Sequence, residues 1–68
     1  MTKKEEKMQR LRLLRTWIST FLRDGIPVDK EYICAHMLVT YGTARRPMME
    51  EIDGVILWLK ENPKEWQR

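Results

Sequence analysis

The sequence predicts an all-α fold, a three-helix bundle that forms a single domain over residues 1–68. Apolar residues recur every three or four positions in three segments, which is the periodicity of amphipathic helices. Turn-forming residues separate these segments, at Gly25-Ile26-Pro27, at Gly42 and at Asn62-Pro63. A chain of 68 residues buries only about 60% of the surface that its unfolded form exposes, so one small helical core is expected.

The first helix is expected at about residues 3–24. Its apolar face consists of Met8, Leu11, Leu14, Ile18, Phe21 and Leu22. Gly25 provides a left-handed cap after Asp24, and Pro27 forces Ile26 out of helical geometry.

Positive charge is concentrated on this first helix. Residues 1–23 contain seven basic and two acidic side chains, whereas the net charge of the whole chain is only +3. The arginines of this helix either face water, with their aliphatic stems covering apolar surface, or bind phosphate groups. Arg12 and Arg15 are the candidates for phosphate binding.

The second helix is expected at about residues 29–40. Asp29 is a suitable N-cap, because its carboxylate can accept a hydrogen bond from a free amide in the first turn. The segment that follows is apolar on nearly all sides, which is typical of a helix packed between others. Its expected core residues are Ile33, Cys34, Met37, Leu38 and Tyr41.

The third helix is expected at about residues 43–61, with Gly42 as the left-handed residue of the turn. Thr43 can act as its N-cap if Pro47 lies in the first turn. Alternatively the helix starts later, with Arg46 as N-cap and Pro47 as the first helical residue.

The apolar stripe of this helix comprises Met48, Met49, Ile52, Val55, Ile56 and Leu59. Its methionines suit the core of a small bundle, although methionine-rich docking surfaces also exist. We expect Glu50, Glu51 and Asp53 to face water. Gly54 in mid-helix predicts close packing against a neighbouring backbone.

After Asn62-Pro63 we expect a flexible tail over residues 62–68, in which Trp66 either folds back on the core or remains available for a partner. These few residues cannot form a two-stranded wing after the third helix.

Catalytic chemistry has no support in the sequence. Cys34 and His36, the only cysteine and the only histidine, are two residues apart and would point in different directions on a helix. We therefore expect no enzyme activity, metal site, cofactor or small-molecule substrate. A lone cysteine in an apolar run favours a reduced thiol and a cytoplasmic protein, and no apolar stretch approaches the roughly 18 residues of a membrane span.

Residues 26–56, IPVDKEYICAHMLVTYGTARRPMMEEIDGVI, resemble the helix-turn-helix core of small microbial and archaeal DNA-binding proteins of the tri-helical and winged-helix kind. The resemblance depends mainly on the Tyr41-Gly42-Thr43 turn and the arginine pair that follows it. It implies a helix-turn-helix, which would lack a wing because the residues after Asn62-Pro63 are too few to form one.

In such proteins the third helix enters the major groove by its N-terminal end. The resemblance therefore implies that Thr43, Ala44, Arg45 and Arg46 contact the groove or phosphates, and that Lys30 contacts the backbone. The implied function is binding of double-stranded DNA, as a transcriptional regulator or as an accessory of the replication machinery.

The alternative is a protein-interaction module that docks as a small subunit on a larger nucleic-acid enzyme. It is favoured by a surplus of large apolar side chains for so small a core, at Leu13, Trp17, Leu57, Trp58 and Trp66. A homodimer is compatible with both functions, with Leu57 and Trp58 against Leu13 or Trp17 as its contacts.

Overall fold

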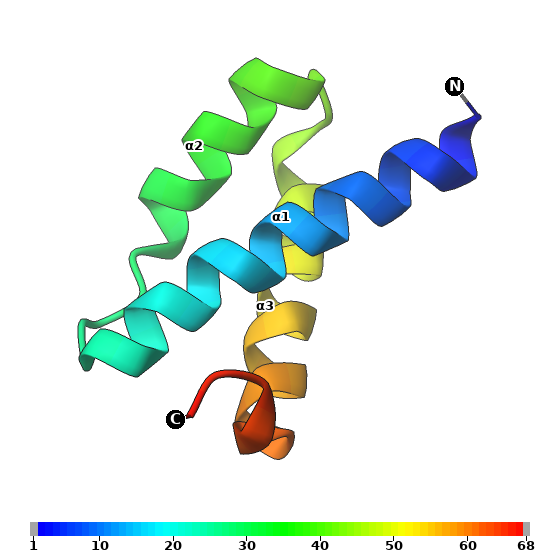
Figure 1. Cartoon of the computed structure of the whole chain (residues 1–68). Coiled ribbons are helices and arrows are strands. Elements are labelled where there is room, and N and C mark those ends of the chain that lie inside the picture. The colour runs from blue at the N-terminus through cyan, green and yellow to red at the C-terminus, as the bar shows by residue number, and fades with distance from the viewer. Residues whose placement is uncertain (1, 68) are drawn as a thin grey trace.

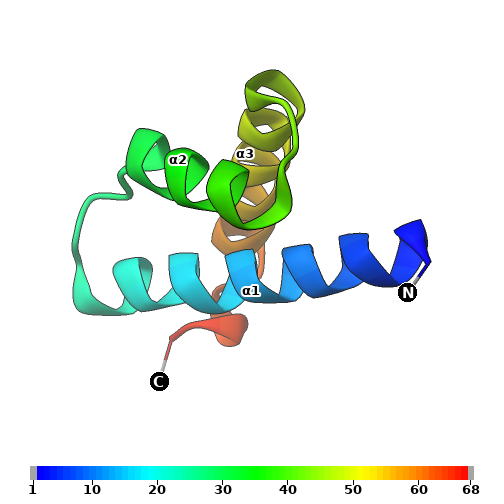
Figure 2. The same cartoon turned by 90° about the horizontal axis from the view of Figure 1, so that it is seen from above.

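The computed structural model describes residues 2–67 and confirms the all-α fold (Figure 1). These residues form three α-helices, α1 (Lys3–Asp24), α2 (Lys30–Tyr41) and α3 (Arg45–Glu61), and a short 3-10 helix, η1 (Pro63–Glu65), with no β-strand among them. Helix α3 is the central element because it packs against both α1 and α2. Figures 1 and 2 show that α1 and α2 run in opposite directions.

Helix α1 has the bounds expected from the sequence, and side chains and backbone close both of its ends. The Thr2 hydroxyl accepts a hydrogen bond from the Glu5 amide at 3.2 Å. At the other end Gly25 has a φ of 69°, and the Ile26 amide reaches back to the Phe21 carbonyl at 2.9 Å. This closure turns the chain sharply towards α2.

The N-cap expected at Asp29 is confirmed, and helix α2 begins with the next residue, Lys30. The Asp29 carboxylate accepts a hydrogen bond from the Tyr32 amide at 3.1 Å. At the C-terminal end Gly42 adopts a φ of 67° and donates its amide to the Leu38 carbonyl at 2.8 Å.

Both expected starting points of the third helix were wrong, since α3 begins at Arg45 with Ala44 as N-cap. Had Thr43 been the N-cap, its carbonyl would have needed an amide hydrogen from Pro47, which proline lacks. The first helical hydrogen bond therefore joins the Met48 amide to the Ala44 carbonyl, at 3.2 Å. Pro47 lies in the first turn, where its missing donor costs least.

The core is formed by nine side chains that are at most 5% exposed: Leu14, Ile18, Ile33, Cys34, Met37, Met48, Ile52, Val55 and Leu59. Met8 continues the apolar stripe of α1 in sequence, but it is 56% exposed. The reason is visible in Figure 1, where the N-terminal turns of α1 extend beyond the other helices.

Two further expectations were wrong. Gly54 is exposed, and a Cβ atom added to it would have no neighbouring atom within 4 Å, so its place in mid-helix does not reflect close packing. Glu51 does not face water but turns towards α1, where it pairs with Arg10.

The expected flexible tail is also incorrect for most of its length. Residues 63–65 form η1, and the indole nitrogen of Trp66 donates a hydrogen bond to the Leu59 carbonyl at 2.7 Å. The Trp66 ring packs against the core cluster, which is the folded-back arrangement considered for this residue. The Leu59 carbonyl has no amide partner four residues on, because residue 63 is proline, and it accepts instead from the Asn62 amide at 3.1 Å and from the Trp66 indole.

Candidate nucleic-acid interface

The residues expected to contact DNA divide into two groups in space. Thr43, Ala44, Arg45 and Arg46 occupy the turn after α2 and the first residues of α3. Lys30 belongs with them, because the first turn of α2 lies against α3: Lys30 contacts Asp53, and its neighbour Glu31 contacts Arg45.

Arg12 and Arg15 form the second group, on α1. The guanidinium of Arg15 lies 4.3 Å from the centre of the Trp58 ring. Trp58 and Arg45 are 13 residues apart on α3, which corresponds to roughly 20 Å along a helix. The structure therefore does not bring Arg12 and Arg15 to the entrance of α3.

Every basic side chain of the first group faces a carboxylate. Arg45 donates to Glu31 at 2.7 Å, Lys30 to Asp53 at 3.0 Å, and Arg46 lies 3.9 Å from Glu50. All six side chains are largely exposed, and exposed ion pairs contribute at most about 1 kcal/mol each. A phosphate group can therefore replace these carboxylates at little cost.

The entrance of α3 also offers free backbone donors. Ala44 has no side-chain oxygen, and no side-chain cap closes this end of the helix. The amides of Arg45 and Arg46 consequently point out of the helix, in the direction that favours an anion.

Beyond the first turn, the outward side of α3 becomes acidic. Glu50, Asp53 and Glu61 are exposed there, on the side opposite the buried Ile52, Val55 and Leu59. Carboxylates repel phosphate, so only the first turn of α3 is electrostatically suited to a nucleic-acid backbone.

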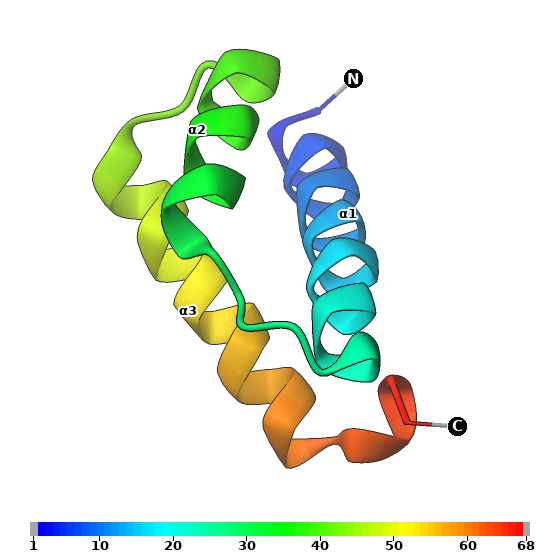
Figure 3. The ribbon, with the colours of Figure 1, turned by 90° about the vertical axis from the view of Figure 1, so that its left-hand side faces the viewer.

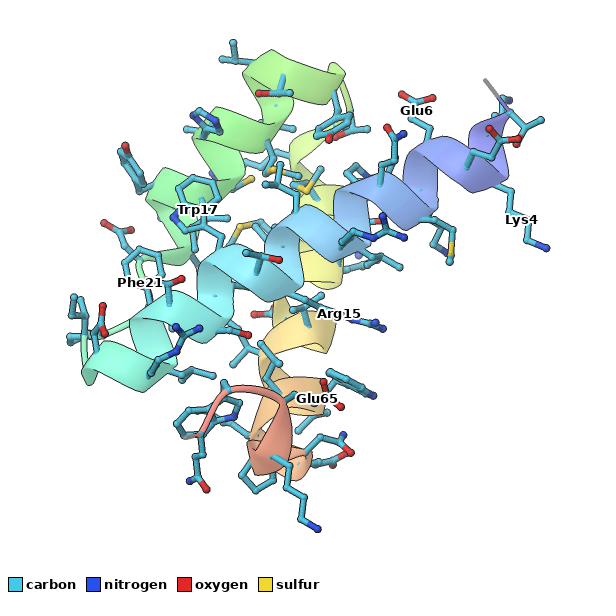
Figure 4. The ribbon with its side chains drawn as sticks, in the orientation of Figure 1. Lys4, Glu6, Arg15, Trp17, Phe21 and Glu65 are labelled. Atoms are coloured by element: carbon cyan, nitrogen blue, oxygen red, sulfur yellow. The ribbon has the colours of Figure 1, made fainter. Side chains whose placement is uncertain are left out.

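The five residues expected at a protein interface do not form one surface. Trp17 lies between α1 and α2 (Figure 4), with its ring centre 5.9 Å from that of Tyr32 and 5.1 Å from that of His36. Arg15, which covers Trp58, is on the other side of α1. Two of the expected dimer contacts, Trp17 and Trp58, therefore lie on different sides of α1 and cannot belong to one surface.

Leu13 and Leu57 are exposed, whereas Trp17, Trp58 and Trp66 are each half-buried by contacts within the chain. Sequence periodicity missed the exposure of Met8, which depends on where the neighbouring helices end. Val39 is 88% exposed because it lies on the side of α2 opposite the buried Ile33, Cys34 and Met37, so this helix is not covered on all sides.

Cys34 is buried, and its thiol lies 3.9 Å from the Arg45 carbonyl oxygen, while His36 is exposed on the other side of α2. Among residues 2–67 no three His, Cys, Asp or Glu side chains are grouped closely enough to hold a metal ion. In the same part of the chain, no helix has the length and apolar character that crossing a membrane requires.

No protein-family model matches the chain, and no curated protein or solved structure shows significant similarity to it.

Proposed function

We propose that this protein is a non-enzymatic helix-turn-helix DNA-binding protein, which contacts duplex DNA with the turn at residues 42–44 and the first turn of α3. The observation that carries the proposal is the three-residue turn around a left-handed Gly42, which delivers two exposed arginines to the start of α3. A short turn with glycine between two helices is typical of this motif.

The contact we propose is mainly with phosphate groups. The backbone amides at the start of α3 and the long, exposed side chains of Arg45 and Arg46 belong to the same helical turn, and amides and guanidinium groups both favour an anion. A phosphate displaces Glu31 from Arg45, which costs little because that ion pair is exposed.

The acidic second turn of α3 limits how far this helix can recognise a DNA sequence. Glu50 and Asp53 would face the DNA if α3 entered the major groove deeply, so the helix approaches by its end. Binding dominated by phosphate contacts is only weakly sequence-specific. This property suits an accessory of the DNA-handling machinery or a transcriptional regulator that acts with a partner. In either role we propose that the protein is cytoplasmic.

The test is the fluorescence anisotropy of a labelled DNA duplex titrated with the protein at about 50 and about 200 mM salt. Affinity falls roughly 3.5-fold per phosphate contact over this range. Because the Arg45→Ala/Arg46→Ala variant lacks two contacts, the ratio of its affinities at low and high salt should be about tenfold smaller than that of the unmodified chain. The control variant Arg23→Ala/Lys64→Ala removes the same charge from exposed positions outside the turn. Equal behaviour of the two variants would exclude the turn as the binding site.

A gain-of-binding variant makes the test sharper. Glu31→Gln removes the carboxylate that occupies Arg45 while leaving Arg45 in place. We expect affinity to rise about two- to fivefold, which corresponds to the worth of one exposed ion pair. Unchanged affinity would show that Arg45 does not contact DNA.

The second candidate function is that of a small subunit that docks on another protein. The specific observation in its favour is that Met8 and Leu57 are 56% and 59% exposed amid charged side chains, as in the polar rim and apolar centre of many interfaces. Absence of DNA binding at both salt concentrations, with an intact helical fold, would favour this function over the first.

A further inference from the structure

Two exposed stripes of side chains on different helices have matching spacing and opposite charge. On α1 the stripe comprises Lys4, Met8, Arg12 and Arg15, with steps of four, four and three residues. On α3 it comprises Glu61, Leu57, Asp53 and Glu50, which has the same steps when the helix is read towards its N-terminus. The first and last members of each stripe are 11 positions apart, or about three helical turns, so the members stay on one side of their helix.

The α1 stripe is an open, slightly hollowed surface. Two neighbouring hollows lie along it, and Met8 and Arg12 line both of them. Figure 4 shows Lys4 and Arg15 on the same side of α1, away from Trp17 and α2. No ion pair within the described residues involves Lys4, Arg12 or Arg15.

The α3 stripe faces outward, on the side opposite the buried residues of that helix. Its acidic members are exposed, and Leu57 is the single large apolar side chain among them. Asp53 and Glu50 have only exposed ion-pair partners, Lys30 and Arg46, which a partner's arginine can replace at little cost. In Figure 3, α1 and α3 lie at two sides of the molecule. The α1–α3 packing within one chain uses the opposite, buried side of α3, so the two stripes of one copy cannot meet each other.

We infer that the α1 stripe binds the α3 stripe of a second copy of this chain, with the two helices antiparallel. In that alignment Lys4 faces the partner's Glu61, Met8 faces the partner's Leu57, Arg12 faces the partner's Asp53, and Arg15 faces the partner's Glu50. Three opposite-charge pairs then flank one apolar contact over about 17 Å of helix.

The arrangement is head-to-tail, because each copy donates a different surface to each neighbour. Such contacts extend into chains or close into rings and do not stop at a two-fold dimer. One helix pair with exposed charges buries less area than a stable interface of standard size, so the association is weak and falls with added salt. It differs from the two-fold dimer considered above in both residues and symmetry, and it requires no DNA.

The experiment measures average mass by sedimentation equilibrium without DNA, from about 10 µM to about 1 mM protein, the range in which weak interfaces associate. We expect the mass to rise with concentration without a plateau at two copies, and to fall towards the monomer in about 0.5 M salt. A monomer at all concentrations, or a plateau at two copies, would overturn the inference.

Charge reversal identifies the surfaces. One variant, Lys4→Glu/Arg15→Glu, makes the α1 stripe repel the acidic α3 stripe, and the other, Glu50→Lys/Glu61→Lys, makes the α3 stripe repel the basic α1 stripe. Each variant alone should remain monomeric, whereas an equal mixture of the two, or one chain carrying all four changes, should associate again.

The matched controls are Arg23→Glu/Lys64→Glu and Asp24→Lys/Glu65→Lys, which change the net charge equally at exposed positions outside the stripes. They should associate like the unmodified chain. Circular dichroism verifies that every variant remains helical. Failure of the mixture to associate, or equal effects of controls and stripe variants, would contradict the pairing, whatever the outcome of the DNA titration.

Discussion

Arg10 of α1 and Glu51 of α3 form a two-pronged ion pair across the bundle. Two guanidinium nitrogens of Arg10, Nη2 and Nε, donate to the Glu51 carboxylate at 2.7 and 3.0 Å, and the two side chains are only 14% and 18% exposed. The hydrogen bond to Glu51 raises the pKa of Arg10 above its ordinary value, against the desolvation that lowers it. A basic group whose pKa is higher in the folded than in the unfolded state stabilises the fold, and this contribution is lost only when the pH rises through the folded-state pKa. Arg10 therefore stays charged, and the ion pair intact, except in strongly alkaline solution.

The first prediction concerns this ion pair. Glu51→Ala leaves a half-buried guanidinium without its partner, so we expect the free energy of unfolding to fall by about 2 kcal/mol. Urea denaturation followed by circular dichroism measures the change. The control is Asp53→Ala, which breaks the exposed pair with Lys30 and should cost less than about 1 kcal/mol. Equal losses would show that burial does not distinguish the two pairs.

Gly54 provides a stabilising substitution. The site is helical, exposed and open around the added Cβ atom, so Gly54→Ala should raise the free energy of unfolding by about 0.5–1 kcal/mol. At Gly42 the same change should destabilise by about 1–2 kcal/mol, because φ there is 67°. Thermal unfolding of both variants measures the contrast, and a loss of stability at Gly54 would contradict the open environment.

The C-terminal segment should contribute to stability through Trp66. Trp66→Phe keeps most of the aromatic surface but removes the indole donor to the Leu59 carbonyl, at an expected cost of about 1 kcal/mol. Trp66→Ala also removes the packing on the core, and we expect a loss of about 3 kcal/mol. Chemical denaturation separates the two effects. Two variants as stable as the unmodified chain would mean that Trp66 does not stabilise the bundle.

Cys34 reports on the opening of the core. Its side chain is 1% exposed, so a thiol reagent should react with it slowly in the folded protein and rapidly in concentrated urea. If reaction requires the bundle to unfold, Glu51→Ala should accelerate the modification and Gly54→Ala should slow it, each in proportion to its effect on unfolding. Rapid modification of the folded protein, unaffected by either substitution, would place the thiol at the surface.

Local sequence information was sufficient to place the three α-helices. The ends of α1 and the N-cap at Asp29 depend on hydrogen bonds between residues three to five positions apart, which any reader of the sequence can anticipate. The buried positions of the three helices likewise follow from periodicity. The exceptions are the start of α3, where the missing amide hydrogen of Pro47 shifts the helix by one residue relative to a Thr43 N-cap, and the 3-10 helix within the expected flexible tail.

The candidate site was only partly accessible from the sequence. The arginines at the start of α3 follow from the resemblance, but their pairing does not. Arg45 and Glu31 are 14 residues apart and Lys30 and Asp53 are 23 apart, so these contacts depend on how α2 crosses α3. The exposure of Glu50 and Asp53 was expected from the sequence, but that of Met8, which completes the α1 stripe, became evident only from the packing.

The sequence by itself determined where this chain is helical, where it turns and which residues form its core, because capping and amphipathic periodicity act over a few neighbouring residues. Only the tertiary structure decided that Glu51 pairs with Arg10, that Trp66 returns to Leu59 and that Met8 is exposed. These outcomes depend on the crossing and relative lengths of the helices, which are set by long-range packing of side chains.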